Sequence, residues 1–334
     1  MGEFDLIARY FARPAKHAPP GRPEAAHVVL GVGDDCALLA PAPGMQLAVS
    51  SDMLVEGRHF LSTVDPTRLG HKALAVNLSD LAACGARPLA FTLALSLPAI
   101  DEAWLAGFSQ GLFALADTHA CELVGGDTTR GPLNICITVF GEVPAGAALL
   151  RAGARAGDDV WVSGSLGDAR LALEAFRGTL SLPAALFAQA RARMESPTPR
   201  VALGQALRGI ASAAVDVSDG LVGDLGHILR ASALGARIDA DAAVACIGAT
   251  AHPDFAAAAL PIDTLRLCAL SGGDDYELVF TAPADARDAV LQAARATDTA
   301  VTRIGRTEAE AGLRLVDAQG APIAQRFGGF DHFA

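Results

Sequence analysis

Lysine is almost absent from this chain of 334 residues, since only Lys16 and Lys72 occur among its 26 basic residues. Neither lysine follows a glycine, so the phosphate-binding loop G-x-x-x-x-G-K-[ST] does not occur. The 37 acidic residues outnumber the basic ones and give a net charge of -11. Because binding to a phosphate backbone needs concentrated positive charge, nucleic acid is not expected as a partner.

Long apolar runs and paired cysteines are missing as well. The longest apolar stretches, such as residues 90–95, are broken by Ser or Pro well before the length of a membrane span, so no membrane association is expected. The N-terminal residues MGEFDLIARYF carry acids where a secretory signal carries bases. The six cysteines form no C-x-x-C pair and no zinc spacing, which is typical of a reduced, cytoplasmic protein.

Several catalytic motifs are absent too. The chain has no G-x-S-x-G elbow, no H-E-x-x-H, no kinase HRD or DFG string and no EF-hand loop. GVGDD lacks the third glycine of a dinucleotide fingerprint. Serine hydrolysis, zinc catalysis, dinucleotide binding and calcium sensing therefore have little support.

What the chain has instead is an aspartate in a short Gly/Ser stretch beside an apolar run, repeated seven times. The stretches are GVGDD (31–35), SSD (50–52), NLSD (77–80), GGDTT (125–129), GSLGD (164–168), DVSDG (216–220) and GGDD (272–275). Carboxylates are hard oxygen ligands, and Gly/Ser loops let several of them converge on one cation. The pattern predicts a multi-aspartate magnesium site, through which an acidic protein could bind a small phosphorylated substrate.

A single aspartate of this kind is more often a turn former or a helix cap. At two positions the sequence favours a binding role over a cap or turn. Asn77 and Asp80 lie one turn apart in the middle of an Ala/Leu-rich helix, where capping does not apply and a polar pair needs a partner. Asp216 directly follows an apolar strand, and Asp219 begins the next helix with Ser218 between them, which favours a corner for cations and phosphate.

Apolar periodicity predicts alternating helices and strands. Helices are expected at residues 4–11, 66–85 with Asp65 as N-cap, from Asp101 through Leu115, and at 183–194, 200–208, 219–234 and 284–296. Strands are expected at 27–40, 45–55, 91–97, 121–126, 133–143, 159–164, 212–217, 267–272, 276–282 and 312–318. The length favours two domains. Regular alternation is compatible with a doubly wound parallel sheet, but closely spaced strand pairs make α+β in each domain at least as well supported.

The segments GVGDDCALL, SSDMLVEGRHF, KALAVNLSDLAACGA, GGDTTRGPL, DVSDGL and SGGDDYEL, in this order and spacing, resemble the thiamine-monophosphate kinase family. The similarity spans essentially the whole chain and ends with FGGFDHF. The family belongs to a superfamily of ATP-using enzymes that includes aminoimidazole ribonucleotide synthetase and selenophosphate synthetase. The resemblance implies a two-domain chain of α/β and α+β class. Residues 1–147 would form an α/β domain that binds metal and nucleotide and dimerises through its sheet, and residues 148–334 an α+β domain, so a homodimer is expected.

The resemblance also implies a set of site residues. Metal contacts are implied for Asp35, Ser50, Ser51, Asp52, Asp80, Asp127, Asp216 and Asp219. Nucleotide contacts are implied for Gly126, Asp127, Arg151 and Ser218, and contacts to thiamine monophosphate for His59, Asp274 and Phe330. The family usually has glutamate at the position of Asp274, and the shorter side chain reaches less far.

The reaction implied is ATP plus thiamine monophosphate giving ADP plus thiamine diphosphate, with several Mg²⁺ ions and ATP as co-substrate. A phosphate monoester has a second pKa of about 6. It is therefore already a competent nucleophile at neutral pH, and no catalytic base is expected. Two alternatives remain at this point: a non-catalytic regulator that binds metal or nucleotide on the same scaffold, and another ATP-using synthetase of the superfamily.

Overall fold

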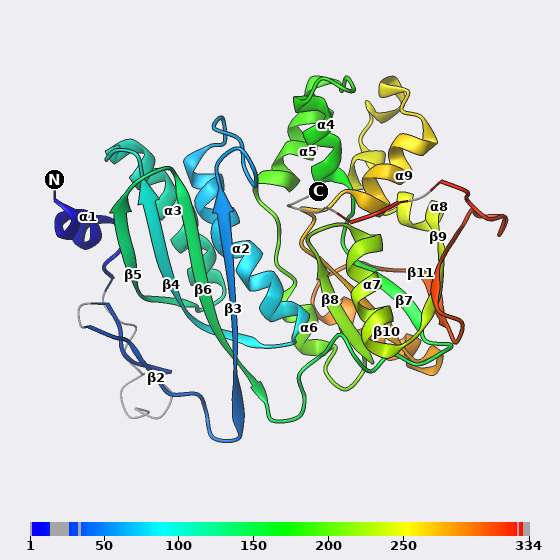
Figure 1. Cartoon of the computed structure of the whole chain (residues 1–334), viewed down its shortest axis with the longest axis horizontal. Coiled ribbons are helices and arrows are strands. Elements are labelled where there is room, and N and C mark those ends of the chain that lie inside the picture. Colours follow the sequence, from blue (N-terminus) through cyan, green and yellow to red (C-terminus); the bar gives the residue numbers. More distant parts are fainter. Residues whose placement is uncertain (1, 14–26, 33–34, 326, 330–334) are drawn as a thin grey trace. The chain divides into compact units, whose positions relative to one another are not determined.

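The computed structural model describes residues 2–13, 27–32, 35–325 and 327–329. The chain divides into two compact units. The first comprises Met1–Leu81 with Ala86–Ala148, and the second Ala82–Gly85 with Leu149–Ala334. Each unit has its own sheet and its own helices (Figure 1).

The first unit is built around a four-stranded sheet of order β3-β6-β4-β5. Only the β4–β5 pair is parallel. Its elements are α1 (Glu3–Tyr10), β1 (Val28–Leu30), β2 (Leu38–Leu39), β3 (Met45–Val55), α2 (Pro66–Ala83), β4 (Arg87–Leu97), α3 (Glu102–Thr118), β5 (Glu122–Arg130) and β6 (Asn134–Pro144).

Helices α2 and α3 cover one face of this sheet (Figure 1). Both begin at the aspartates that the sequence indicated. Asp65 Oδ1 accepts hydrogen bonds from the backbone N–H groups of residues 67 and 68, and Asp101 Oδ1 from those of residues 103 and 104. The helices approach so closely that a Cβ on Gly111 would lie 1.8 Å from the carbonyl oxygen of Thr67. Glycine is therefore required at this crossing.

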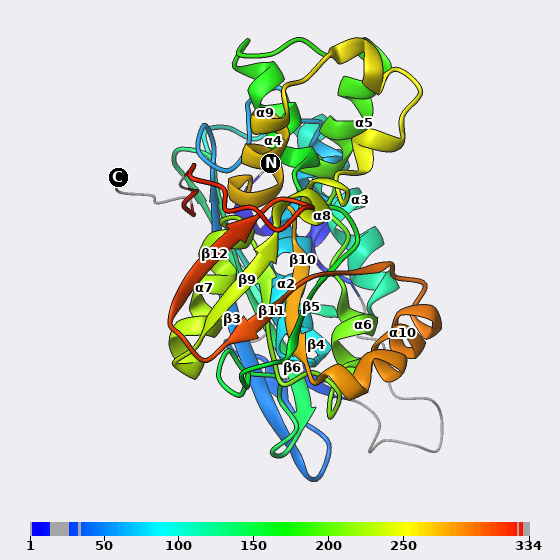
Figure 2. The same ribbon diagram turned by 90° about the vertical axis from the view of Figure 1, so that its right-hand side faces the viewer.

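The second unit has a six-stranded sheet of order β12-β9-β11-β7-β10-β8, in which only the β12–β9 pair is parallel. Helices α4 (Asp168–Phe176), α5 (Ala184–Glu195) and α9 (Ile262–Ser271) lie together at one end of the sheet (Figure 2). The elements are β7 (Asp159–Ser163), α4 (Asp168–Phe176), α5 (Ala184–Glu195), α6 (Val201–Ala206), β8 (Ala213–Val217), α7 (Leu221–Ser232), β9 (Gly235–Asp239), α8 (Ala240–Val244), η2 (Gly248–Ala251), η3 (Phe255–Ala258), α9 (Ile262–Ser271), β10 (Glu277–Ala282), η4 (Ala284–Ala286), α10 (Arg287–Ala296), β11 (Val301–Glu308) and β12 (Gly312–Val316).

The two compact units, each with helices and a sheet, confirm the two-domain chain of mixed α and β class. Antiparallel pairs dominate both sheets, which rules out doubly wound parallel sheets. One predicted strand was wrong, because residues 267–272 form the last turns of α9 and the residue after it. The buried residues Leu265, Cys268 and Ala269 of this helix follow helical spacing. The predicted strand at 27–40 contains two short strands instead, and α4, β9, α8 and β11 were not predicted.

Among the described residues, no helix has both the length and the apolar character needed to cross a membrane.

Candidate metal and nucleotide site

The polar pair inside α2 has its partners on strand β3. Asn77 Oδ1 accepts a hydrogen bond from the backbone N–H of Asp52 at 3.0 Å, while its amide nitrogen donates to the carbonyl of Ala73, also at 3.0 Å. Ser50 Oγ donates a short hydrogen bond to the carboxylate of Asp80. The structure therefore brings Ser50, Asp52 and Asp80 together between one strand and the helix that covers it.

Ser51 lies on the opposite face of the same strand. Successive side chains of a strand point to opposite faces, and Ser51 is exposed where its two neighbours are half-buried. Its hydroxyl is 3.0 Å from Thr138 Oγ1 and donates to the carbonyl of Ile137 at 3.2 Å. Within one chain, the structure does not bring Ser51 into the group formed by Ser50, Asp52 and Asp80.

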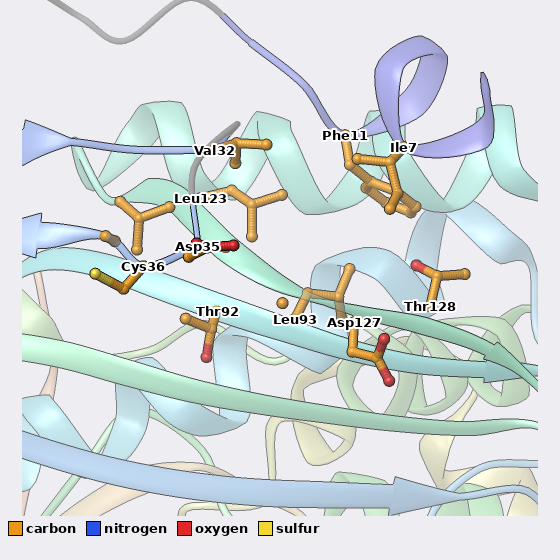
Figure 3. Close-up of a pocket in the computed structure, with 14 residues that line it drawn as sticks. Ile7, Phe11, Val32, Asp35, Cys36, Thr92, Leu93, Leu123, Asp127 and Thr128 are labelled. Atoms are coloured by element: carbon orange, nitrogen blue, oxygen red, sulfur yellow. The ribbon is translucent and has the colours of Figure 1, made fainter. Parts of the chain in front are cut away.

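A second group lies at the other edge of this sheet, on β5. Gly126 has φ of 148°, and a Cβ there would lie 1.8 Å from the carbonyl oxygen of Leu93, so only glycine fits. Gly126, Asp127 and Asp35 line one pocket of about 670 Å³, a volume typical of small-molecule sites. Figure 3 shows the side chains of Asp127 and Thr128 leaving β5 in opposite directions, with Thr128 toward α1.

These two groups cannot share one ion within a single chain. The strand register aligns Asp52 with Ile137, Ile137 with Leu93, and Leu93 with Gly126. Asp52 and Gly126 are thus three strand spacings apart, or roughly 14 Å. The predicted metal ligands of the first unit therefore need either more than one ion or a second chain.

His59 lies just after β3 and is tied to the end of that strand. Its Nδ1 accepts a hydrogen bond from the backbone N–H of Val55 at 3.0 Å, and its own backbone N–H donates to the carbonyl of Val55 at 3.0 Å. An Nδ1 that accepts carries no proton, so a neutral ring holds its proton on Nε2. The strand end thus fixes both the position and the tautomer of this predicted substrate residue.

In the second unit, the predicted residues occupy the turn between β8 and α7. Asp216 is buried near the end of β8, and Ser218 and Asp219 follow in the turn. Helix α7 begins at Leu221, two residues later than predicted. The backbone N–H groups of Ser218 and Asp219 both donate to Asp224 Oδ2, each at 3.0 Å.

Asp224 was missed by sequence reasoning, although it holds this turn in place. It lies in the first turn of α7 and is almost fully buried. Burial raises the pKa of Asp224 to about 7, and the nearby charge of Asp219 acts in the same direction, against the lowering effect of the backbone N–H groups. An acid four residues after the end of DVSDG, at the start of an apolar helix, was the available signal.

Asp274 contacts the same turn. Its backbone N–H donates to the carbonyl of Ser218 at 2.7 Å, and its side chain is half-buried. Arg151 is exposed. Burial lowers the pKa of His227 on α7, the charges of Arg151 and Arg230 act in the same direction, and the charge of Asp219 raises it. Arg151 and Asp219 therefore both act on one side chain of α7. Phe330, the remaining predicted substrate residue, lies outside the described residues.

The donor atoms are chemically suited to magnesium, because they are carboxylate and hydroxyl oxygens. In the described part of the chain, no three His, Cys, Asp or Glu side chains are grouped closely enough to hold a metal ion. Magnesium is usually bound through one or two carboxylates plus substrate phosphates and water, so a loose arrangement of carboxylates fits this ion.

The aspartate of the motif GSLGD has a structural role and is not part of the candidate magnesium site. Asp168 is buried, with 1% of its surface exposed, and accepts hydrogen bonds from the backbone N–H groups of Gly248 at 2.9 Å and Ala249 at 2.7 Å. Burial raises its pKa. Asp168 is thus a structural aspartate that connects the start of α4 to residues 248–249.

Comparison with known proteins places the chain in a class and then in a family. Residues 33–143 match the N-terminal domain, and residues 155–318 the C-terminal domain, of AIR synthase related proteins. These two matches, which together cover most of the chain, place it in the class of AIR synthase related proteins. The chain is also 47% identical to a thiamine-monophosphate kinase from Salmonella typhimurium over 100% of this chain and 98% of that protein.

Solved structures, among them that of a thiamine-monophosphate kinase, resemble this chain as well. The crystal structure of thiamine-monophosphate kinase from Stenotrophomonas maltophilia K279a is 48% identical, with a TM-score of 0.80 over 90% of this chain and 93% of that chain. AaThiL complexed with AMPPCP and TMP is 28% identical, with a TM-score of 0.73 over 88% and 89% of the two chains. The chain belongs to the thiamine-monophosphate kinase family and is an enzyme of that family, which confirms the resemblance read from its motifs.

Proposed function

We propose that the chain transfers the γ-phosphoryl group of ATP directly to the phosphate of thiamine monophosphate, giving ADP and thiamine diphosphate in a magnesium-dependent reaction. The observation that carries this proposal is family membership over the full length of the chain. A relative was solved with AMPPCP and TMP, which we interpret as an ATP analogue and thiamine monophosphate, the two substrates proposed here.

The nucleotide and its metal ions are assigned to the aspartate motifs. Asp35, Ser50, Ser51, Asp52, Asp80, Asp127, Asp216 and Asp219 are the proposed metal ligands. Bound Mg²⁺ would supply charge neutralisation between two anionic substrates. Gly126, Asp127, Arg151 and Ser218 are assigned to the nucleotide, with the guanidinium of Arg151 suited to a two-pronged contact with phosphate.

The acceptor is assigned to His59, Asp274 and Phe330. The hydrogen bonds between His59 and Val55 hold the imidazole in a fixed orientation. The half-buried position of Asp274 beside Ser218 would place an acceptor contact next to a nucleotide contact. The carboxylate of Asp274 would bind the aminopyrimidine of thiamine.

No residue is assigned as a general base. The monoester of the acceptor has a second pKa of about 6, so one of its phosphate oxygens attacks the γ-phosphorus without first losing a proton. The bond from the γ-phosphorus to the bridging oxygen of ADP breaks in line with this attack. The role of the protein is to orient the two substrates and to exclude water from the γ-phosphorus.

A non-catalytic regulator on the same scaffold is the second candidate. A decayed site would be expected to have lost ligands, whereas every aspartate that the family motifs require is present in the sequence. This completeness favours the enzyme over the regulator.

The experiment is an assay of ADP release with the purified full chain. ADP and thiamine diphosphate should form only when ATP, thiamine monophosphate and Mg²⁺ are all present, and EDTA should abolish the reaction. Unphosphorylated thiamine, which lacks the ionised nucleophile, should be a poor acceptor. A folded protein that binds ATP but forms no thiamine diphosphate would support the regulator instead.

We also propose that the chain forms a homodimer through the four-stranded sheet. The face of β3 opposite to α2 exposes Leu47, Val49 and Met53, each by 45% or more. An apolar stripe of this kind on a sheet is typical of a surface that binds another protein.

A further inference from the structure

Asp275, next to the proposed acceptor residue Asp274, is a buried acid for which the proposed function has no role. Only 5% of its surface is exposed. Its Oδ1 accepts a hydrogen bond from the backbone N–H of Gly167 at 2.9 Å. Its Oδ2 is buried and has no hydrogen-bond partner among the described residues. A buried polar atom without a partner destabilises a fold, so its presence requires an explanation.

The backbone around Asp275 is strained on both sides. Asp274 has φ of 62° and Tyr276 has φ of 52°, a left-handed conformation that a bulky side chain such as tyrosine rarely adopts. Such conformations persist only where the surrounding contacts impose them, and they concentrate at functional sites. The segment 273–276 is therefore held in place from outside and does not follow local preference.

Two sets of contacts hold this segment. On one side, the backbone N–H groups of Asp274 and Tyr276 donate to the carbonyls of Ser218 at 2.7 Å and Val217 at 2.9 Å. On the other side, the Asp275 carboxyl accepts from Gly167. Gly167 has φ of 79°, and a Cβ there would lie 2.8 Å from the backbone of Cys268. Asp275 thus fastens the segment to GSLGD, a motif that has no role in the proposed site.

We infer that Asp275 is a positioning residue that holds Asp274 in its strained conformation against Ser218, so that Asp274 can contact the acceptor. This inference rests on the proposed function, because it takes Asp274 as the acceptor contact. It gives the GSLGD motif a role as the fixed support for the acceptor segment. It also explains why a polar side chain of this length is buried here, since its oxygen must reach the Gly167 N–H from a residue between two left-handed neighbours.

Burial disfavours the charged form of the Asp275 carboxyl. Burial raises its pKa well above the usual range, and the nearby acids Asp168 and Glu277 act in the same direction, while the Gly167 hydrogen bond and Arg193 lower it. A neutral carboxylic acid and an asparagine have nearly the same shape, and both offer an oxygen to the Gly167 N–H. An asparagine at this position should therefore preserve the hydrogen bond to Gly167 and the function of Asp275, whereas an alanine should lose both.

The experiment compares Asp275→Ala, Asp275→Asn and Asp274→Ala by steady-state kinetics of the full chain. Asp275→Ala should raise KM for thiamine monophosphate roughly tenfold, as Asp274→Ala should also raise it. KM for ATP should stay within about twofold of the wild-type value. Asp275→Asn should restore the wild-type KM. If Asp275→Ala does not fold, Asp275→Ser provides the same comparison, because its hydroxyl is too short to reach Gly167.

Asp159→Ala is the matched control. Asp159 is a buried aspartate of the same unit, and its carboxylate bonds Arg287 and Arg303, which lie outside both GSLGD and the segment 273–276. Asp159→Ala should lower Tm and leave KM for thiamine monophosphate unchanged. Equal KM values for Asp275→Ala and Asp159→Ala would overturn the inference, as would an Asp275→Asn variant as impaired as Asp275→Ala. A wild-type chain without activity would instead overturn the proposed function.

Discussion

Asp80 shows at the residue scale how a helix-interior acid differs from a cap. Its carboxylate accepts a hydrogen bond from Ser50 on the neighbouring strand, whereas the carboxylate of Asp101 binds the first N–H groups of its own helix. Both are aspartates of the first unit, and only the contacts separate their roles. Exchanging each for a neutral residue distinguishes a metal ligand from a cap.

Asp52→Asn, Asp80→Asn and Asp127→Asn should each lower kcat by roughly 100-fold or more and leave the protein folded. The neutral amide removes a metal ligand but also relieves repulsion among neighbouring carboxylates, so Tm without metal should stay equal or rise. Mg²⁺ should raise Tm of the wild type more than Tm of these variants. The measurements are kcat at saturating substrates and thermal melts with and without Mg²⁺.

Asp101→Ala is the control for this series. Losing an N-cap lowers the free energy of unfolding by about 0.5 to 2 kcal/mol, and kcat should be unchanged. If a variant among Asp52, Asp80 and Asp127 behaved like Asp101→Ala, that aspartate would be structural and would leave the proposed metal set.

How far residues could be assigned from sequence depended on the range of their contacts. The caps Asp65 and Asp101 were predicted, because their partners lie two and three residues away. The need of Asn77 and Asp80 for partners was predicted, but the strand that supplies them was not. Asp275 could not be assigned a contact, since Gly167 is 108 residues away in the sequence.

Among the elements, periodic helices were predicted best and short apolar segments worst. Helices α2 and α3 have a cap, an apolar face and a clear length, so pattern and structure agree. The last turns of α9 were assigned to a strand, because a run of four apolar residues fits a buried helix as well as a strand. The predicted metal, nucleotide and substrate contacts of the site residues remain predictions from family resemblance.

The end of α3 gives a prediction about pH. His119 is the C-cap of this helix, and burial lowers its pKa, with the charge of His71 acting in the same direction. The folded state therefore resists protonation, whereas the unfolded chain binds a proton below about pH 6.5. The stability contributed by neutral His119 is present above this pH and is lost as the pH falls through the lower folded pKa.

His119→Gln should make Tm less dependent on pH. Between pH 7.5 and pH 5.5, the fall in Tm should be smaller than in wild type by about 2 °C or more. Thr118→Ala, which alters the same helix end without a titratable group, is the control and should lower Tm equally at both pH values. Parallel Tm curves for wild type and His119→Gln would show that other groups cause the acid sensitivity.

For the whole molecule, the open question is whether the exposed stripe on β3 is a subunit contact. Val49 lies in the middle of this stripe and is 55% exposed, while the half-buried side chains on either side of it in the sequence face α2. The opposite edges of the sheet carry Asp52 and Asp127, which one ion cannot join within one chain. Several ions within one chain would satisfy these carboxylates as well, so it is the exposed apolar stripe that favours a second copy of the chain.

Val49→Arg should convert the dimer to a monomer. Burying an unpaired guanidinium in an apolar interface should cost at least about 3 kcal/mol, which weakens association by roughly 100-fold or more. Sedimentation velocity at micromolar concentration should show a dimer for wild type and a monomer for the variant. Ile262→Arg is the matched control, because Ile262 on α9 is similarly exposed, at 47%, and belongs to the other unit. A Val49→Arg protein that still sediments as a dimer would assign the contact to another surface, and a monomeric wild type would reject the homodimer altogether.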